Sequence, residues 1–178
     1  FYMMKYHFRA NRFKRASNWI DKINPKQLAG FDRPEFYFKK AYCLFTTKNY
    51  TEALENFRLA KTVATKYSYP STYYIAYILY LQEKYTESLE EFLNLKESTV
   101  YADVYPFYVT DIYYRLGKYE EAIEYGRGVL KNNQVTKYAP PITRIVANCY
   151  FKQSVYDNSL FYYKKYLGFQ ALPISPLL

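Results

Sequence analysis

The sequence has few of the residues from which most metal and catalytic sites are built. Its 178 residues include two cysteines, Cys43 and Cys149, and one histidine, His7. Two cysteines are too few for a disulfide-stapled scaffold, and with a single histidine they are too few for a zinc site. Catalysis by a serine–histidine or cysteine–histidine pair loses most of its support for the same reason. We therefore expect no metal, no cofactor and no enzymatic activity.

Glycine and long apolar runs are also scarce. The five glycines argue against a loop-rich all-β fold and against a low-complexity chain. Charged residues interrupt every apolar stretch well before the roughly 18 to 20 residues that a membrane span needs, so no span is expected in this segment. The first five residues resemble the middle of an amphipathic segment rather than a leader peptide, so we expect a fragment of a longer protein.

Aromatic residues are abundant instead, with 25 tyrosines and 13 phenylalanines, and they recur at a fixed period. Four strings read aromatic, two polar residues, a small residue and an aliphatic residue. They begin at Tyr50, Tyr85, Tyr119 and Tyr156, and a weaker copy begins at Phe13. Apolar or small residues stand mostly in register nine and six positions before, and seven and ten positions after, these five marker aromatics. Such spacings place each set on one stripe of a helix, so each repeat is predicted to be a helix pair.

Prolines mark the same period, and the turns within the predicted pairs are short. Short turns force neighbouring helices to run antiparallel, and Pro34, Pro70, Pro106 and Pro141 stand near the start of each first helix. The predicted fold class is all-α, a right-handed α-solenoid of about five stacked antiparallel helix pairs and ten helices. We expect a single solenoid over 1–168, with a tail or the start of a truncated further repeat at 169–178. The expected repeats are about 1–30, 34–67, 69–101, 103–135 and 140–168.

These residues resemble the tetratricopeptide repeat, in which small and aromatic residues and a proline recur over about 34 residues. The resemblance covers almost the whole chain in four good copies and one weaker copy. The sequence departs from the pattern at Gly126, where an aromatic residue is usual, and in two periods lengthened to 37 residues. The tyrosine-rich texture also resembles long periplasmic repeat proteins of Bacteroidetes, which implies a periplasmic or outer-membrane-associated location in a bacterium.

The resemblance implies a binding site for an extended peptide, a helix or a partner's tail. In tetratricopeptide proteins the first helix of each repeat lines a concave groove, mainly with positions about 12, 8, 5 and 4 residues before the marker. Tyrosine suits such a surface because its ring gives a large contact area at a small entropy cost. An alternative for Phe45, Tyr80, Tyr114 and Phe151 is packing between adjacent first helices. The predicted groove residues are Phe38, Tyr42, Phe45, Tyr73, Tyr77, Tyr80, Phe107, Asp111, Tyr114, Arg115, Arg144, Asn148 and Phe151.

Two further functions stay open beside a protein-binding scaffold. The net charge is +9, and the N-terminal stretch carries a basic strip. A solvated helix surface is the commoner explanation of such a strip, and binding of nucleic acid or an anionic surface is the less favoured one. The other alternative is a structural spacer or oligomerisation module. The basic strip consists of Lys5, Arg9, Arg12, Lys14, Arg15, Lys22 and Lys26.

The two cysteines and the histidine are expected to be packing residues. Cys43 and Cys149 both lie seven residues before a marker aromatic, in equivalent positions three repeats apart. Packed helices are already about 8 to 10 Å apart, whereas a disulfide needs Cα atoms within about 7 Å. We therefore expect no disulfide between them. His7 stands where other repeats have leucine or tyrosine.

Overall fold

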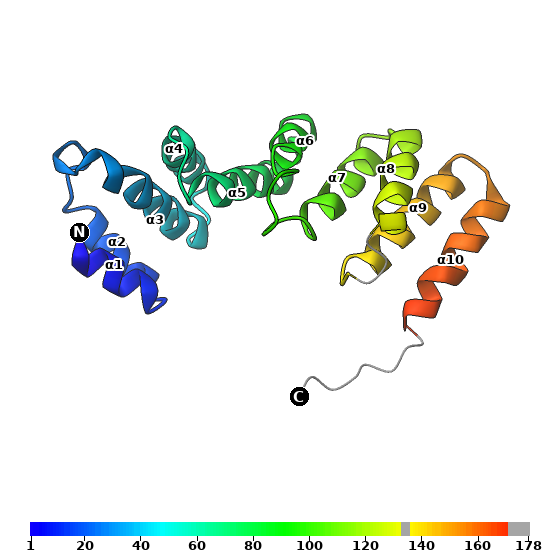
Figure 1. Cartoon of the computed structure of the whole chain (residues 1–178), viewed down its shortest axis with the longest axis horizontal. Coiled ribbons are helices and arrows are strands. Elements are labelled where there is room, and N and C mark those ends of the chain that lie inside the picture. The colour runs from blue at the N-terminus through cyan, green and yellow to red at the C-terminus, as the bar shows by residue number, and fades with distance from the viewer. Residues whose placement is uncertain (133–135, 171–178) are drawn as a thin grey trace. The chain divides into compact units, whose positions relative to one another are not determined.

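The computed structural model describes residues 1–132 and 136–170, and within these ranges every regular element is helical. Successive α-helices form antiparallel pairs (Figure 1), so the all-α prediction of about five pairs is confirmed. Each second helix begins at its marker aromatic. The elements are α1 (Tyr2–Arg9), α2 (Phe13–Ile20), the 3-10 turns η1 (Pro25–Gln27) and η2 (Gly30–Asp32), α3 (Arg33–Thr46), α4 (Tyr50–Lys61), α5 (Ser68–Leu81), α6 (Tyr85–Leu93), α7 (Tyr105–Arg115), α8 (Tyr119–Asn132), α9 (Ala139–Lys152) and α10 (Tyr156–Gln170).

The helices divide into two compact units, Phe1–Glu91 and Phe92–Leu178, with the boundary inside α6. Each hydrophobic core joins one helix pair to the first helix of the next pair, as expected where no pair can bury its apolar stripe alone. In unit 1, Leu54 and Phe57 of α4 share a core with Ile75 of α5. In unit 2, Ile123 of α8 shares a core with Val146 of α9. Of the predicted 169–178 tail, α10 includes residues 169 and 170, and 171–178 lie outside the described residues.

The small residue three positions after each marker aromatic is buried in every pair. Because protein interiors are closely packed, a larger side chain there would have to displace its neighbours. Where this residue is serine, its hydroxyl donates a hydrogen bond to a carbonyl of the first helix. The distance is 2.8 Å in the third pair, from α6 to α5, and 3.0 Å in the last pair, from α10 to α9. The five residues are Ala16, Ala53, Ser88, Ala122 and Ser159.

One turn geometry closes all five pairs. In the second pair, the amide of Lys48 donates to the carbonyl of Phe45 and the amide of Asn49 to that of Leu44, each at 2.9 Å. This is a Schellman motif, which satisfies the last helix carbonyls and reverses the chain within a few residues. It requires a positive φ two residues before each marker aromatic. The residues with that φ are Asn11, Lys48, Glu83, Gly117 and Ser154.

We expect Glu83→Gly to raise the free energy of unfolding by about 0.5 to 1 kcal/mol. Relief of the left-handed backbone is worth about 1 to 2 kcal/mol, offset by about 0.4 to 1 kcal/mol of added freedom in the unfolded chain. Gly117→Ala should cost about 1 kcal/mol, because a Cβ there meets no atom within 4 Å and only the backbone is strained. Urea denaturation measures both changes. Glu90→Gly, inside α6, is the control and should cost about 1 kcal/mol; a similar loss for Glu83→Gly would contradict the turn assignment.

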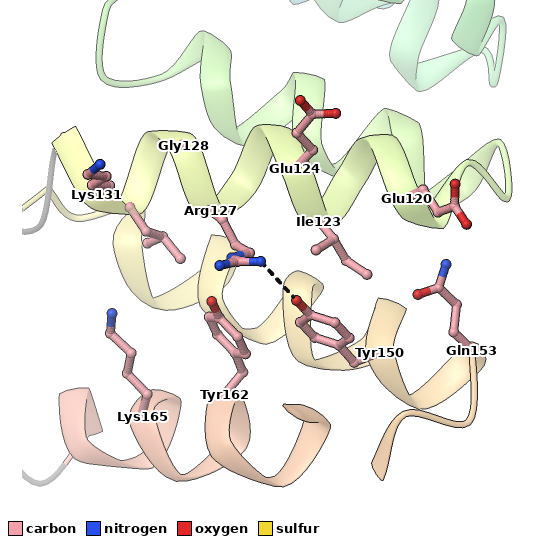
Figure 2. A pocket seen from close by; sticks show the side chains of 11 residues that line it. Glu120, Ile123, Glu124, Arg127, Gly128, Lys131, Tyr150, Gln153, Tyr162 and Lys165 are labelled. Carbon is pink, nitrogen blue, oxygen red and sulfur yellow. Dashed lines mark hydrogen bonds between the residues drawn. The ribbon is translucent and has the colours of Figure 1, made fainter. Parts of the chain in front are cut away.

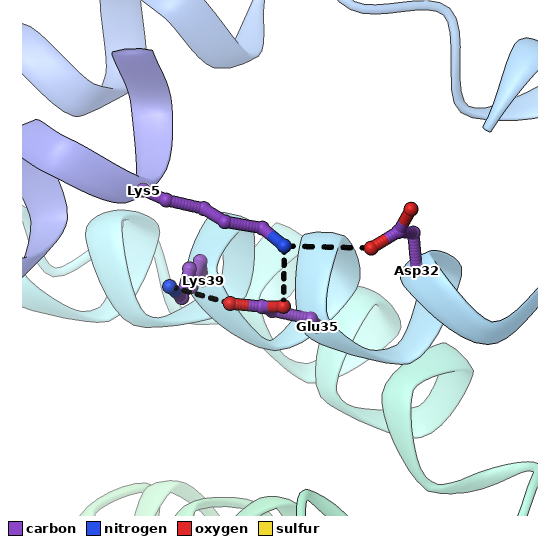
Figure 3. A network of polar contacts seen from close by, with 4 residues as sticks. All are labelled: Lys5, Asp32, Glu35 and Lys39. Carbon is purple, nitrogen blue, oxygen red and sulfur yellow. Dashed lines mark hydrogen bonds and ion pairs between the residues drawn. The ribbon is translucent and has the colours of Figure 1, made fainter. Parts of the chain in front are cut away.

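A partly buried charge network joins α1 to the start of α3 in unit 1 (Figure 3). Glu35 pairs with the Nζ atoms of Lys5 and Lys39, each at 2.8 Å, and Lys5 Nζ also lies 3.4 Å from Asp32. Only 6% of Lys39 is exposed, and its Nζ lies 5.0 Å from the ring centre of Phe8. Burial alone would raise the pKa of Glu35, but hydrogen bonds and attraction from Lys39 and Lys5 hold it below its ordinary value.

Gly126 departs from the repeat pattern for a steric reason. The helix α8 passes so close to its neighbours that a Cβ at Gly126 would lie 2.7 Å from Val146 Cγ2 and 3.2 Å from Thr110 Cγ2. Both are branched side chains in a buried position, so neither can swing away at little cost. The aromatic residue that is usual at this position has no room here.

The cysteines and the histidine are all buried. Burial raises the pKa of the Cys43 thiol to about 11 and that of Cys149 to about 12, so both stay protonated and poorly reactive at neutral pH. Within the described residues neither thiol forms a disulfide. His7 packs beside Tyr6, with 5.2 Å between ring centres, and its Nδ1 has no hydrogen-bond partner among the described residues.

Candidate functional site

Six of the predicted groove residues lie together on α3 and α5 of unit 1. We call them the first-helix aromatic surface. None of the six side chains is fully buried. Ring contacts link five of them, which are Phe38, Tyr42, Phe45, Tyr73 and Tyr77. Tyr73 and Tyr77 stack with 6.1 Å between ring centres and 7° between planes, and Tyr77 lies 6.1 Å from Phe45. The surface consists of Phe38, Tyr42, Phe45, Tyr73, Tyr77 and Tyr80.

The rings of this surface differ in how firmly the core holds them. Phe38 lies 5.6 Å from the buried ring of Phe57 and 5.3 Å from Tyr67, so it helps to pack α3 against α4. Tyr42 has ring neighbours on four helices. Packing therefore holds its ring in place, although part of the side chain is exposed. The rings within 6.5 Å of Tyr42 are those of Phe8, Phe13, Phe38, Phe45 and Tyr74.

In unit 2 the predicted polar groove residues are engaged locally. The Asp111 carboxylate is buried and pairs with Arg115 one turn further along α7. The Asn148 side-chain oxygen accepts a hydrogen bond from the Tyr163 hydroxyl of α10 at 2.6 Å. Arg144 is exposed, with its guanidinium 6.0 Å from a tyrosine ring centre. The predicted basic character of this end therefore depends mainly on Arg144 rather than on Arg115.

The predicted aromatic groove residues of unit 2 are spread among separate contacts. Phe107 is half-buried and stacks on Tyr138, with 5.6 Å between ring centres. Tyr114, also half-buried, lies 5.8 Å from Tyr119 within its own pair. Phe151 is 56% exposed. In the described part of unit 2 no ring contact joins these three residues to one another, in contrast to the aromatic residues of unit 1.

A hollow of about 640 Å³ lies between α8, α9 and α10 of unit 2 (Figure 2). Arg127 Nη1 donates a hydrogen bond to the Tyr150 hydroxyl at 3.4 Å. The rings of Tyr150 and Tyr162 stack with 5.6 Å between centres, and burial raises the pKa of Tyr162. Lys131 and Lys165 lie at one end, so the hollow combines an aromatic wall with a cationic end.

The sequence prediction missed this hollow because it considered only the first helices. Arg127 and Lys131 stand four residues apart on the second helix α8, so they share one face. Tyr150 lies six residues before its marker aromatic, a position that the repeat pattern assigns to the core. The feature of the sequence that could have indicated this hollow is therefore the pair of cations one turn apart on α8.

Two cations of the basic strip on the N-terminal helices are already in contact with other side chains, so only part of the strip is available to bind an anion. Lys5 is held by Glu35 and Asp32, and Lys22 Nζ lies 5.0 Å from the ring centre of Trp19. The other members of the strip are exposed. Among the described residues no helix is long and apolar enough to cross a membrane.

Comparisons with known proteins bear on the fold. No protein-family model matches the sequence, and no curated protein matches it. Among solved structures, MamA of AMB-1 matches with a TM-score of 0.77 and 14% identity over 94% of this chain and 88% of MamA. YrrB, described as a TPR protein with an unusual peptide-binding site, gives a TM-score of 0.77 and 14% identity over 96% of this chain and 84% of YrrB. The apo form of RapI gives 0.71 and 17% identity over 91% of this chain and 50% of RapI.

At these identities the likeness defines the class of fold. The chain has the tetratricopeptide repeat fold, and the predicted α-solenoid class is confirmed. The resemblance to Bacteroidetes proteins and the location that it implies stay predictions.

Proposed function

We propose that the chain is a noncatalytic scaffold that binds a peptide or partner protein on the first-helix aromatic surface. The observation that carries the proposal is the stacked pair Tyr73 and Tyr77 beside Phe45. These rings are held in place by one another while part of each stays exposed. A partner would therefore gain a large apolar contact without a large cost in side-chain ordering.

The fold supports a peptide as the guest. A solved structure of the same fold, YrrB, is described as having a peptide-binding site. The paired acids of the second helices are poor candidates for catalysis, because adjacent side chains diverge by about 100° around a helix. One of them, Glu91, is held by Lys61 at 2.6 Å.

The double substitution Tyr73→Ala/Tyr77→Ala tests the proposal. Peptides are first selected from a random library on the wild-type chain, and their affinity is then measured by titration calorimetry. We expect the double variant to lose about five- to 150-fold in affinity, because two ring contacts of about 0.5 to 1.5 kcal/mol each disappear. Circular dichroism verifies that the variant is folded.

Tyr2→Ala is the matched control, since Tyr2 is an exposed tyrosine of the same unit that lies on α1, outside the first-helix aromatic surface. Its affinity for the selected peptides should equal that of the wild type. A folded Tyr73→Ala/Tyr77→Ala variant that binds the peptides as tightly as the wild type would overturn the proposal.

A further inference from the structure

Three cations line one end of the hollow between α8, α9 and α10. Arg127 and Lys131 stand one turn apart on α8, and Lys165 comes from α10 (Figure 2). All three side chains are exposed, and none of them forms an ion pair within the residues that the structure describes. Like charges that gather without a counter-charge repel one another, so this end attracts an anion that carries more than one charge.

A wall of rings and aliphatic side chains adjoins these cations. Tyr150 is buried and Tyr162 is half-buried, and their rings stack with 24° between planes. The Tyr150 hydroxyl accepts a hydrogen bond from Arg127, which holds the guanidinium beside the rings. Ile123 and Leu130 complete the wall. Such a wall suits a flat ring of a ligand, because planar groups stack favourably on aromatic side chains.

Hydrogen-bond acceptors line the opposite end of the hollow. Glu120 begins the second turn of contacts on α8, and Gln153 follows the end of α9; their side chains point toward one another (Figure 2). Glu124, one turn from Glu120, adds a second carboxylate to the lining. An ionised carboxylate only accepts hydrogen bonds, so this end suits a ligand group that donates them.

The gap between successive second helices is closed differently in unit 1. There Lys61 of α4 pairs with Glu91 of α6 at 2.6 Å. These residues stand eleven and six positions after their marker aromatics, and the equivalent residues of α8 and α10 are Leu130 and Tyr162. Neither of these two can form an ion pair, and both line the hollow. The hollow therefore lies between two helices that are both described, and the residues at these two positions distinguish it from the linked gap of unit 1.

We infer that this hollow binds a mononucleotide whose base carries an amino group. Its phosphate lies against Arg127, Lys131 and Lys165, because a phosphate monoester has a charge of about −1.5 to −2 at neutral pH. Its base packs on the wall of Tyr150 and Tyr162, and its amino group donates to the acceptors at the far end. The hollow, of about 640 Å³, lies within the range of about 300 to 1,000 Å³ that is typical of small-molecule sites.

The charges at the far end favour a single nucleotide over a nucleic acid strand. Glu120 and Glu124 would repel every phosphate that follows the first along a strand. The site is also separate from the first-helix aromatic surface, because that surface belongs to unit 1 and the hollow belongs to unit 2. Binding of a nucleotide in the hollow therefore does not depend on the proposed binding of a peptide.

Titration calorimetry of the whole chain with adenosine 5′-monophosphate (AMP) tests the inference. Lys131→Ala/Lys165→Ala should weaken AMP binding by at least about tenfold, because hydrogen bonds to a charged group are lost. Tyr162→Ala should weaken it by about five- to 150-fold, because the base loses its stacking partner. Adenosine, which lacks the phosphate, should bind at least about tenfold more weakly than AMP. Inosine 5′-monophosphate, which lacks the amino group, should also bind more weakly.

Lys118→Ala/Lys164→Ala is the matched control, because it removes the same charge at two exposed lysines that do not line the hollow. It should bind AMP as the wild type does, as should Tyr73→Ala/Tyr77→Ala, and circular dichroism verifies the folding of every variant. A wild type that binds no AMP at millimolar concentrations would overturn the inference. So would an equal loss in the two double lysine variants, which indicates attraction to the net charge alone, or inosine 5′-monophosphate that binds as tightly as AMP.

Discussion

Replacing Glu35 by glutamine is expected to lower the free energy of unfolding by about 2 to 4 kcal/mol. The substitution keeps the shape of the side chain but removes the charge that pairs with Lys39 and Lys5 at 2.8 Å. Lys39 is almost wholly buried, and a buried charge left without its partner is costly, by about 3 to 5 kcal/mol when no water reaches it. Urea denaturation measures the loss. Glu55→Gln, at an exposed carboxylate of α4, is the control and should change stability by no more than about 0.5 kcal/mol.

The same network predicts a particular pH dependence. The pKa of Glu35 is lowered in the folded chain, so its charge stabilises the fold above its ordinary value of 4.5, and this stability is lost as the pH falls through the folded pKa. The pKa of Lys5 is raised despite its burial, by its bonds to Glu35 and Asp32, so its contribution is lost only above pH 10.5. As the pH is lowered, the free energy of unfolding should therefore fall less steeply for Glu35→Gln than for the wild type. An unchanged acid slope would contradict this role of Glu35.

Alanine at Gly126 and at Gly128 should change stability in opposite directions. Gly126→Ala places a Cβ 2.7 Å from Val146, and such overpacking costs about 1 to 3 kcal/mol. Gly128→Ala, half a turn further along α8, adds a Cβ that meets nothing within 4 Å, so it should gain about 0.5 to 1 kcal/mol from the better helix propensity of alanine. Thermal and urea denaturation compare the two variants directly. A gain at both positions would show that α8 does not approach α7 and α9 this closely.

The repeat pattern favours an aromatic residue at position 126, and such a residue should lower the stability of the fold more than alanine does. Gly126→Phe must displace Val146, Thr110 or Ile142 from a buried position, and it is expected to prevent unit 2 from folding. Proton NMR would show this as a loss of dispersed methyl signals. A well-folded Gly126→Phe variant would contradict the packing of α8.

The helix pairs and their register could be predicted from the sequence because both follow from periodicity. The marker aromatics Tyr50, Tyr85 and Tyr119 each begin a second helix, as the spacing predicted. The turn geometry could be read only in part from residue types, because of the five left-handed residues only Gly117 and Asn11 are of types that this conformation favours. At Lys48 and Glu83 the packing of two helices fixes the turn and overrides the local preference.

The binding surface was only partly predictable, because register does not determine neighbours. Tyr42 and Tyr77 both stand eight residues before a marker aromatic. Tyr42 nevertheless lies within 5.4 Å of the rings of Phe8 and Phe13, which the preceding pair supplies. The same register position therefore serves packing in one repeat and a more open stacked pair in the next. Only the side chains of adjacent repeats decide between these roles.

Amide hydrogen exchange with a bound peptide tests most directly whether the first helices of unit 1 form the binding surface. A peptide selected on the wild-type chain should slow exchange in α3 and α5, around Phe45, Tyr73 and Tyr77, and the effect should vanish in Tyr73→Ala/Tyr77→Ala. Slowed exchange confined to α8, α9 and α10, around Arg127 and Tyr150, with α3 and α5 unchanged, would contradict it.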